Sequence, residues 1–89
     1  MTGSGVLPVI DVLFFGRVRE ELDCARLSVV DAPDLDTLQA RLADEYGERW
    51  AAVLGQDNII RAVNQAIVAG NATLEGGDEV AFFPPVTGG

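Results

Sequence analysis

Apolar and polar residues alternate with a period of two along two segments near the ends of the chain, and this period predicts a strand in each. The first strand covers residues 9–15, and the last covers residues 78–83. The first strand has Ile10, Val12 and Phe14 on one face and Val9, Asp11, Leu13 and Phe15 on the other; in the last strand Val80 and Phe82 alternate with Ala81 and Phe83. Because Asp11 favours water, we expect its face of the first strand to be the less buried one.

A second period, of three and four residues, begins at residue 35 and predicts the main helix. Its apolar stripe consists of Leu35, Leu38, Leu42 and Tyr46. Asp34 precedes the stripe as an expected N-cap, because its carboxylate can accept hydrogen bonds from free N–H groups of the first turn. Gly47 is expected to close the helix. Residues 48–54 predict a short second helix that packs Trp50 and Leu54 on the core, so we interpret Trp50 as a packing residue rather than a binding platform.

Shorter patterns complete the fold. Residues 17–22 predict about one helical turn, and strands are predicted over residues 26–30, 58–63 and 66–68. Asn64 and Gln65 stand where a tight hairpin turn needs positive φ angles. A hairpin, a helix and further strands indicate an α+β fold of the β-grasp (ubiquitin-like) type, a mixed sheet with one main helix packed across it. We divide the chain into a flexible N-terminus (1–8), a β-grasp domain (9–83) and an extended C-terminal tail (84–89).

The tail has a distinctive order of residues. Pro84 and Pro85 end the last strand, and because proline lacks an N–H donor and fixes φ, they predict an extended, stiff segment. At about 3.3 Å per residue the tail reaches roughly 20 Å beyond the sheet, enough to enter the cleft of another protein. Gly88 and Gly89 have no side chains, so the terminal carboxylate can thread a narrow channel. A frayed end is the alternative, but stiff prolines followed by the slimmest residues favour a functional tail.

The charge and composition of the chain argue against several classes of function. The chain has fourteen acidic residues and six arginines, and it has no lysine or histidine, so its net charge is −8. This balance argues against nucleic-acid binding and predicts partners with basic surfaces. The lack of histidine and the single cysteine leave few routes to nucleophilic or metal catalysis, so we expect a donor or ligand and no metal site. Cys24 could carry sulfur as a persulfide, but no lysine or histidine is present to activate it, and we interpret it as inert.

The expected location is the cytoplasm. No apolar run approaches the ~20 residues of a membrane span, and no basic segment followed by an apolar one begins the chain. A single cysteine cannot form an internal disulfide, which fits a reducing compartment. We therefore expect no membrane association.

Five segments, which span nearly the whole chain after Pro8, carry a resemblance to a known family. These are VLFF at 12–15, VRE at 18–20, RW at 49–50, AVNQ at 62–65 and GDEVAFFPPVTGG at 77–89. Together they resemble the small, sulfur-carrier subunits of molybdopterin synthase. The last segment is the most diagnostic, and the longer N-terminus is the one visible departure.

The resemblance implies a mechanism in which the chain itself is a non-catalytic, sulfur-donating subunit with no bound cofactor. An E1-like adenylyltransferase would use ATP to adenylate Gly89, and a sulfur donor protein would supply the sulfur that converts the adenylate to a thiocarboxylate. The tail would then enter the large subunit of molybdopterin synthase and pass sulfur to cyclic pyranopterin monophosphate. The family also implies a heterotetramer, a dimer of large subunits with a carrier at each end.

Residues outside the tail are expected to bind the partners. Leu13, Phe15, Ile67 and Phe83 are predicted to form one exposed apolar patch with Arg19 at its edge, which would dock the partners while Pro84, Pro85, Val86 and Thr87 contact them along the tail. The alternative is that these are ordinary core residues or scattered surface residues. Two other function classes stay open: a sister sulfur carrier for thiamine synthesis or tRNA thiolation, and a non-covalent ubiquitin-like interaction module with an inert tail. The Phe-Phe-Pro-Pro context favours the molybdopterin family.

Overall fold

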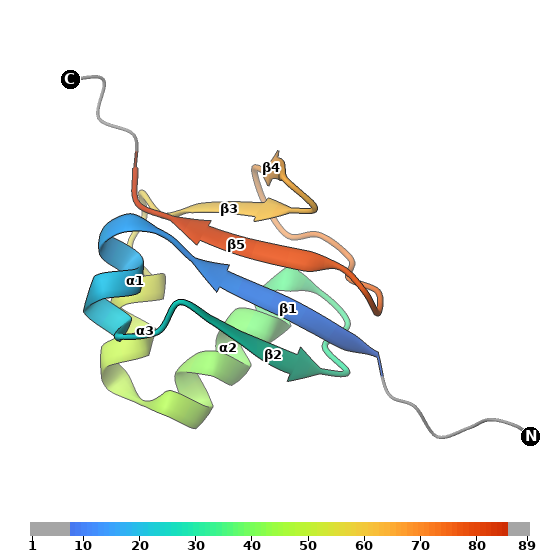
Figure 1. The fold of residues 1–89 in the computed structure, drawn as a ribbon, viewed down its shortest axis with the longest axis horizontal. Coiled ribbons are helices and arrows are strands. Elements are labelled where there is room, and N and C mark those ends of the chain that lie inside the picture. Colours follow the sequence, from blue (N-terminus) through green and yellow to red (C-terminus); the bar gives the residue numbers. More distant parts are fainter. Residues whose placement is uncertain (1–7, 86–89) are drawn as a thin grey trace, which may run out of the picture.

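A five-stranded mixed sheet organises the chain, whose residues 8–85 are described by a computed structural model. The elements in order are β1 (Val9–Phe14), α1 (Gly16–Leu22), β2 (Arg26–Val30), α2 (Leu35–Tyr46), α3 (Glu48–Leu54), β3 (Ile60–Val63), β4 (Ala66–Val68) and β5 (Glu79–Phe83). The strands are ordered β2-β1-β5-β3-β4; β1 and β5 run parallel at the centre, and the other neighbours run antiparallel. The helices lie on one side of the sheet (Figure 1). The predicted β-grasp architecture is confirmed.

Three predicted strands are shorter than expected, among them the last one, which begins at Glu79 rather than at residue 78. The first ends at Phe14 rather than at residue 15, because Phe15 is the extended N-cap residue of α1. The third begins at Ile60 rather than at residue 58. Residues 17–22 form helix α1 with Gly16, so the predicted helical turn is confirmed. Helix α1 therefore begins almost directly after β1, with only Phe15 between them.

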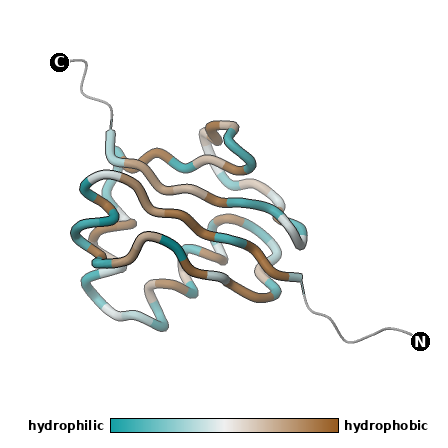
Figure 2. Tube along the Cα trace, viewed as in Figure 1, coloured by the Kyte–Doolittle hydropathy of each residue, from teal (hydrophilic) through white to brown (hydrophobic). Residues whose placement is uncertain are grey.

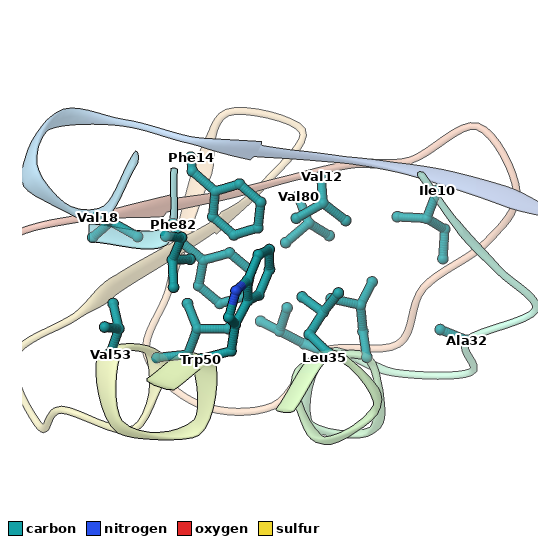
Figure 3. Packing of buried hydrophobic residues seen from close by; sticks show 14 of the residues in the cluster. Ile10, Val12, Phe14, Val18, Ala32, Leu35, Trp50, Val53, Val80 and Phe82 are labelled. Carbon is teal, nitrogen blue, oxygen red and sulfur yellow. The ribbon is translucent and has the colours of Figure 1, made fainter. Parts of the chain in front are cut away.

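The core lies between the sheet and the helices, where the predicted inner faces of the strands are buried. Ile10, Val12 and Val80 are 0% exposed, and apolar residues are concentrated along β1 and β5 (Figure 2). Figure 3 shows Phe14, Phe82 and Trp50 packed together beneath the sheet. The Phe14 ring meets Trp50 edge to face, with 5.4 Å between ring centroids, and stacks on Phe82 at 5.7 Å. Trp50 is 8% exposed, so its predicted packing role is confirmed.

Helix α2 covers the sheet through its leucines. Leu35, Leu38 and Leu42 are buried, as predicted, whereas Tyr46 is 47% exposed. The prediction of a buried stripe is wrong at Tyr46 because this last residue of α2 turns toward α3, where it stacks on Trp50 at 4.4 Å. The predicted cap is confirmed, since the Asp34 carboxylate accepts a hydrogen bond of 2.7 Å from the Thr37 N–H.

The β3–β4 hairpin is fastened to the start of β5 by one turn residue. Asn64 and Gln65 have the predicted positive φ angles of 50° and 71°. The Asn64 side chain donates to the Asp78 carboxylate at 3.0 Å and accepts from the Glu79 N–H at 3.0 Å, while the Asn64 N–H donates to the Glu79 carbonyl at 2.7 Å. The other Asp78 oxygen accepts from the Glu75 N–H at 2.8 Å. This network fixes the backbone of Glu79.

The carboxylates of Asp34 and Asp78 make the stability of the fold depend on pH. The backbone hydrogen bond from Thr37 lowers the pKa of Asp34, and the Asn64 side chain, with the Glu75 N–H, lowers the pKa of Asp78. Both pKa values are below the ordinary 3.8 in the folded chain, so near that pH the unfolded chain binds more protons. The stabilisation is therefore complete well above pH 3.8 and is lost as pH falls through the lowered values.

We expect the thermal unfolding midpoint to fall as the pH is lowered from about 5 to about 3. An Asp34→Asn, Asp78→Asn double variant removes both titrating groups while keeping hydrogen-bonding amides. It should start from a lower midpoint at neutral pH and lose less on acidification than the unmodified chain. Calorimetry of both proteins across this range measures the difference, and parallel curves would contradict the assignment to these two carboxylates.

Candidate functional site

An apolar groove of about 750 Å³ crosses the sheet face opposite the helices. Its lining comes from β1, β3, β4 and β5, from Phe15 and Gly16 at the start of α1, from Gln65 in the β3–β4 turn, and from the two prolines that follow β5. The location follows from the alternation of side chains, because Ile10, Val12 and Phe14 point toward the helices and the residues between them point away. The expected less buried face of β1 is therefore the face that bears the groove.

Small side chains form the middle of the groove, and larger ones stand beside it. Ala62 on β3 and Ala81 on β5 are partners in the sheet register, and they are 2% and 7% exposed. On the outer sides, Leu13 on β1 is the neighbour of Ala81, and Ile67 on β4 is the neighbour of Ala62. Ile67 is 74% exposed, an unusual state for a large apolar side chain. A projecting apolar side chain of another protein would fit between these walls.

Aromatic rings and prolines form the end of the groove from which the tail departs. The rings of Phe15 and Phe83 are stacked with centroids 4.8 Å apart and planes 7° from parallel. Gly16 has a φ of 56°, and a Cβ there would lie 2.9 Å from Cγ of Pro84. The absence of a side chain at Gly16 thus lets Pro84 lie against the start of α1. The base of the tail is held at the rim of the groove.

The structure brings together most of the predicted partner-binding residues that it describes. Phe15, Ile67, Phe83, Pro84 and Pro85 all line the groove, together with Leu13. Whether they bind a partner stays a prediction. The remaining tail positions, Val86, Thr87, Gly88 and Gly89, lie outside the described residues.

Arg19 is not among the residues that line the groove, although it was expected at the edge of the patch. It contributes instead to a separate hollow beside Cys24. The reason is the helical period of α1: Val18 and Leu22 face the core, and the next position after Val18 faces outward.

Sequence reasoning missed two polar residues in the groove lining, Gln65 and Glu79. Glu79 could have been found, since it lies two residues before Ala81 and four before Phe83 and therefore shares their face of β5. Gln65 belongs to the hairpin turn, and no periodic signal places a turn side chain.

The described residues offer little other chemistry. Within residues 8–85, no group of three histidine, cysteine, aspartate or glutamate side chains is placed to hold a metal ion. Cys24 is partly buried against the core, and its Sγ–H donates to the Arg26 carbonyl at 3.5 Å. In the same part of the chain no helix is long and apolar enough to span a membrane.

Comparison with known proteins gives the family. The ThiS family matches residues 12–89, which include the groove and the tail. The chain belongs to the ThiS family. The curated molybdopterin synthase sulfur carrier subunit of Escherichia coli (strain K12) is 44% identical to it over 82 residues, covering 91% of this chain and 100% of that protein. The corresponding subunit of Haemophilus influenzae is 37% identical, again covering 91% and 100%. The resemblance predicted from the sequence motifs is confirmed.

Solved structures are also similar to this chain. A chain in the protein-protein complex of subunits 1 and 2 of molybdopterin-converting factor from Helicobacter pylori has 30% sequence identity and a TM-score of 0.67, covering 91% of this chain and 99% of that one. The solution structure of small archaeal modifier protein 1 from Methanosarcina acetivorans has a TM-score of 0.72 and 19% identity, covering 96% and 100%. The second likeness shows the fold alone.

Proposed function

We propose that this ThiS-family chain is a sulfur carrier for molybdenum cofactor biosynthesis and acts as the small subunit of a molybdopterin synthase. The observation that carries the proposal is the match to the whole length of the Escherichia coli sulfur carrier subunit at 44% identity. The geometry agrees with it, because the groove and the base of the tail adjoin at Pro84 and Pro85. A carrier needs such a docking surface next to the segment that it delivers.

The reactive atom in this proposal is the carboxylate carbon of Gly89. A carboxylate is a poor electrophile, so an E1-like adenylyltransferase first joins a Gly89 oxygen to the α-phosphorus of ATP and releases pyrophosphate. A sulfur nucleophile, provided by a sulfur donor protein, then attacks the acyl carbon, and AMP leaves with that oxygen. The thiocarboxylate that results is a stored nucleophile. It is delivered to the large subunit, where two such transfers to cyclic pyranopterin monophosphate complete the dithiolene.

The groove is the proposed docking surface for the large subunit. Its apolar floor and the stacked pair Phe15–Phe83 offer the kind of aromatic and aliphatic surface that dominates protein interfaces. The molybdopterin-converting factor of Helicobacter pylori forms a complex of subunits 1 and 2, which supports an assembly of this kind. The net charge of −8 leaves the binding of ATP and of the pterin phosphate to basic residues of the partners.

Intact mass spectrometry tests the proposal directly. The full chain is incubated with an E1-like adenylyltransferase, ATP and sulfide, and we expect a product about 16 Da heavier, since one carboxylate oxygen is replaced by sulfur. Omitting ATP should prevent the change, and an established sulfur carrier treated in parallel verifies the enzyme. An unchanged mass beside a converted control would contradict the proposal and favour an interaction module with an inert tail.

A further inference from the structure

We propose that Glu79 is the ionic anchor of the groove and that it selects a docking segment of the large subunit in which an apolar ridge is followed by a basic side chain. This inference rests on the proposed function, because it describes the chemistry of the partner that the same groove accepts. It assigns a specificity role to a residue in the groove lining that is neither aromatic nor aliphatic.

The groove is polarised along β5. Glu79, Ala81 and Phe83 share one face of the strand, so a carboxylate lies at one end of the groove and the stacked rings and prolines lie at the other. A strand rises about 3.3 Å per residue, which puts the backbone of Glu79 roughly 13 Å from that of Phe83. A segment that lies along the groove therefore contacts apolar surface at the end near the tail and a negative charge at the opposite end.

The Glu79 carboxylate has no ionic partner within residues 8–85. The salt bridges of this part of the chain join Arg17 to Glu21, Arg26 to Asp11 and Arg61 to Asp36. Asp11 is the register partner of Glu79 on β1, so two carboxylate residues stand on neighbouring strands and repel one another. Asp11 is compensated by Arg26, 3.6 Å away, but Glu79 is not. A cation brought by a partner would relieve this repulsion.

The position of Glu79 is fixed before any partner arrives. Asn64 forms hydrogen bonds with both the N–H and the carbonyl of Glu79. The Asn64 side chain also donates a hydrogen bond to the Asp78 carboxylate. Four hydrogen bonds thus maintain the backbone from which the carboxylate projects, counting the bond from Glu75 to Asp78. A charge on a fixed backbone loses less conformational freedom on binding than one on a mobile loop.

Docking makes the unpaired charge selective. A partner that covers the groove removes water from Glu79, which is already only partly exposed. Taking an unpaired carboxylate out of water is costly, whereas a facing arginine or lysine turns the same burial into a hydrogen-bonded ion pair. A purely apolar segment would fit the alanine floor but would leave Glu79 without a partner. The carboxylate therefore rejects apolar segments that lack a cation.

Calorimetric titration of the large subunit with the full carrier chain tests this inference. Glu79→Gln keeps the shape of the side chain and should weaken binding about tenfold, and Glu79→Arg should weaken it about a hundredfold, because it places a second cation against the first. Asp44→Arg is the matched control: it makes the same change in net charge at an exposed position of α2, on the helical side of the sheet, and should weaken binding less than about threefold. Binding of the unmodified chain should also weaken with salt more steeply than that of Glu79→Gln.

The outcomes separate the inference from the function on which it rests. If the unmodified chain binds the large subunit but Glu79→Arg weakens it no more than Asp44→Arg does, the anchor is overturned and the carrier function stands. If Glu79→Gln leaves affinity and salt dependence unchanged, the anchor is overturned as well. If the unmodified chain fails to bind any large subunit, the carrier function and the anchor fail together. Circular dichroism of each variant verifies that the fold is retained.

Discussion

A chain that lacks Gly89 will gain no sulfur, although its fold will be unchanged. The truncated chain still ends in a carboxylate, on Gly88, but this group lies about 3.3 Å short of the position that Gly89 reaches. A displacement of even about 1 Å from the productive geometry can cost a hundredfold in rate, so activation should fall below detection. The expected mass spectrum after incubation with the E1-like adenylyltransferase, ATP and sulfide shows no species heavier by about 16 Da.

Removal of residues 1–7 is the matched control, because it shortens the chain at the other end. Pro8 then remains to accept the hydrogen bond of 2.8 Å from the Asp31 N–H that holds the start of β1. This variant should be converted as fully as the intact chain, and both truncated chains should unfold at the same temperature as the intact chain. Normal conversion of the chain that lacks Gly89 would show that the terminal carbon is not the reactive centre.

Local patterns predicted the faces of the elements well, for a simple physical reason. The strand period of two assigned Ile10 and Val12 to the core and Leu13 to the other face, and the structure agrees because the sheet is covered by helices on one side only. The same reasoning placed the aromatic rings of Phe15 and Phe83 on one surface, where they are stacked. A groove formed by alternate strand positions is therefore accessible to sequence reasoning.

Features that depend on long-range pairing were not accessible. The chain has 64 residues between the end of β1 and the start of β5. Nothing in the local pattern says that these strands lie parallel at the centre of the sheet, and so nothing set Glu79 beside Asp11. Arg61 on β3 is a similar case: its guanidinium donates to Asp36 on α2 at 2.8 Å and to the carbonyl of Gly70, which follows β4, at 3.0 Å. Such contacts follow from the topology of the fold. The spacing of apolar residues, every second residue in a strand or every third or fourth in a helix, does not encode it.

Two neighbouring phenylalanines should give opposite results when each is replaced by alanine. Phe14 is 1% exposed and packs against Trp50 and Phe82, so Phe14→Ala should cost about 3–5 kcal/mol of folding free energy. For a domain of this size that corresponds to a fall of roughly 12–40 °C in the unfolding midpoint. Since small domains have only about 5–15 kcal/mol of stability in total, this loss removes a large share of it. Calorimetry measures it.

Phe15→Ala is the matched control for Phe14→Ala, because it removes the same side chain from the next residue in the sequence. It also tests whether the groove binds the partner. Phe15 is 40% exposed, and its principal partner is the Phe83 ring, so its loss should cost only about 1 kcal/mol of stability. It removes half of the aromatic wall of the groove, however, and should weaken binding to the large subunit by about tenfold or more. Phe14→Ala, measured at a temperature where it is folded, should bind within about threefold of the unmodified chain, because its side chain faces the helices. Equal losses of stability would contradict the assignment of Phe14 to the core and Phe15 to the open face. Unchanged binding of Phe15→Ala would show that the open face of the sheet is not the docking surface. The crossed result would show that of two neighbouring residues at the end of β1, Phe14 holds the fold and Phe15 meets the partner.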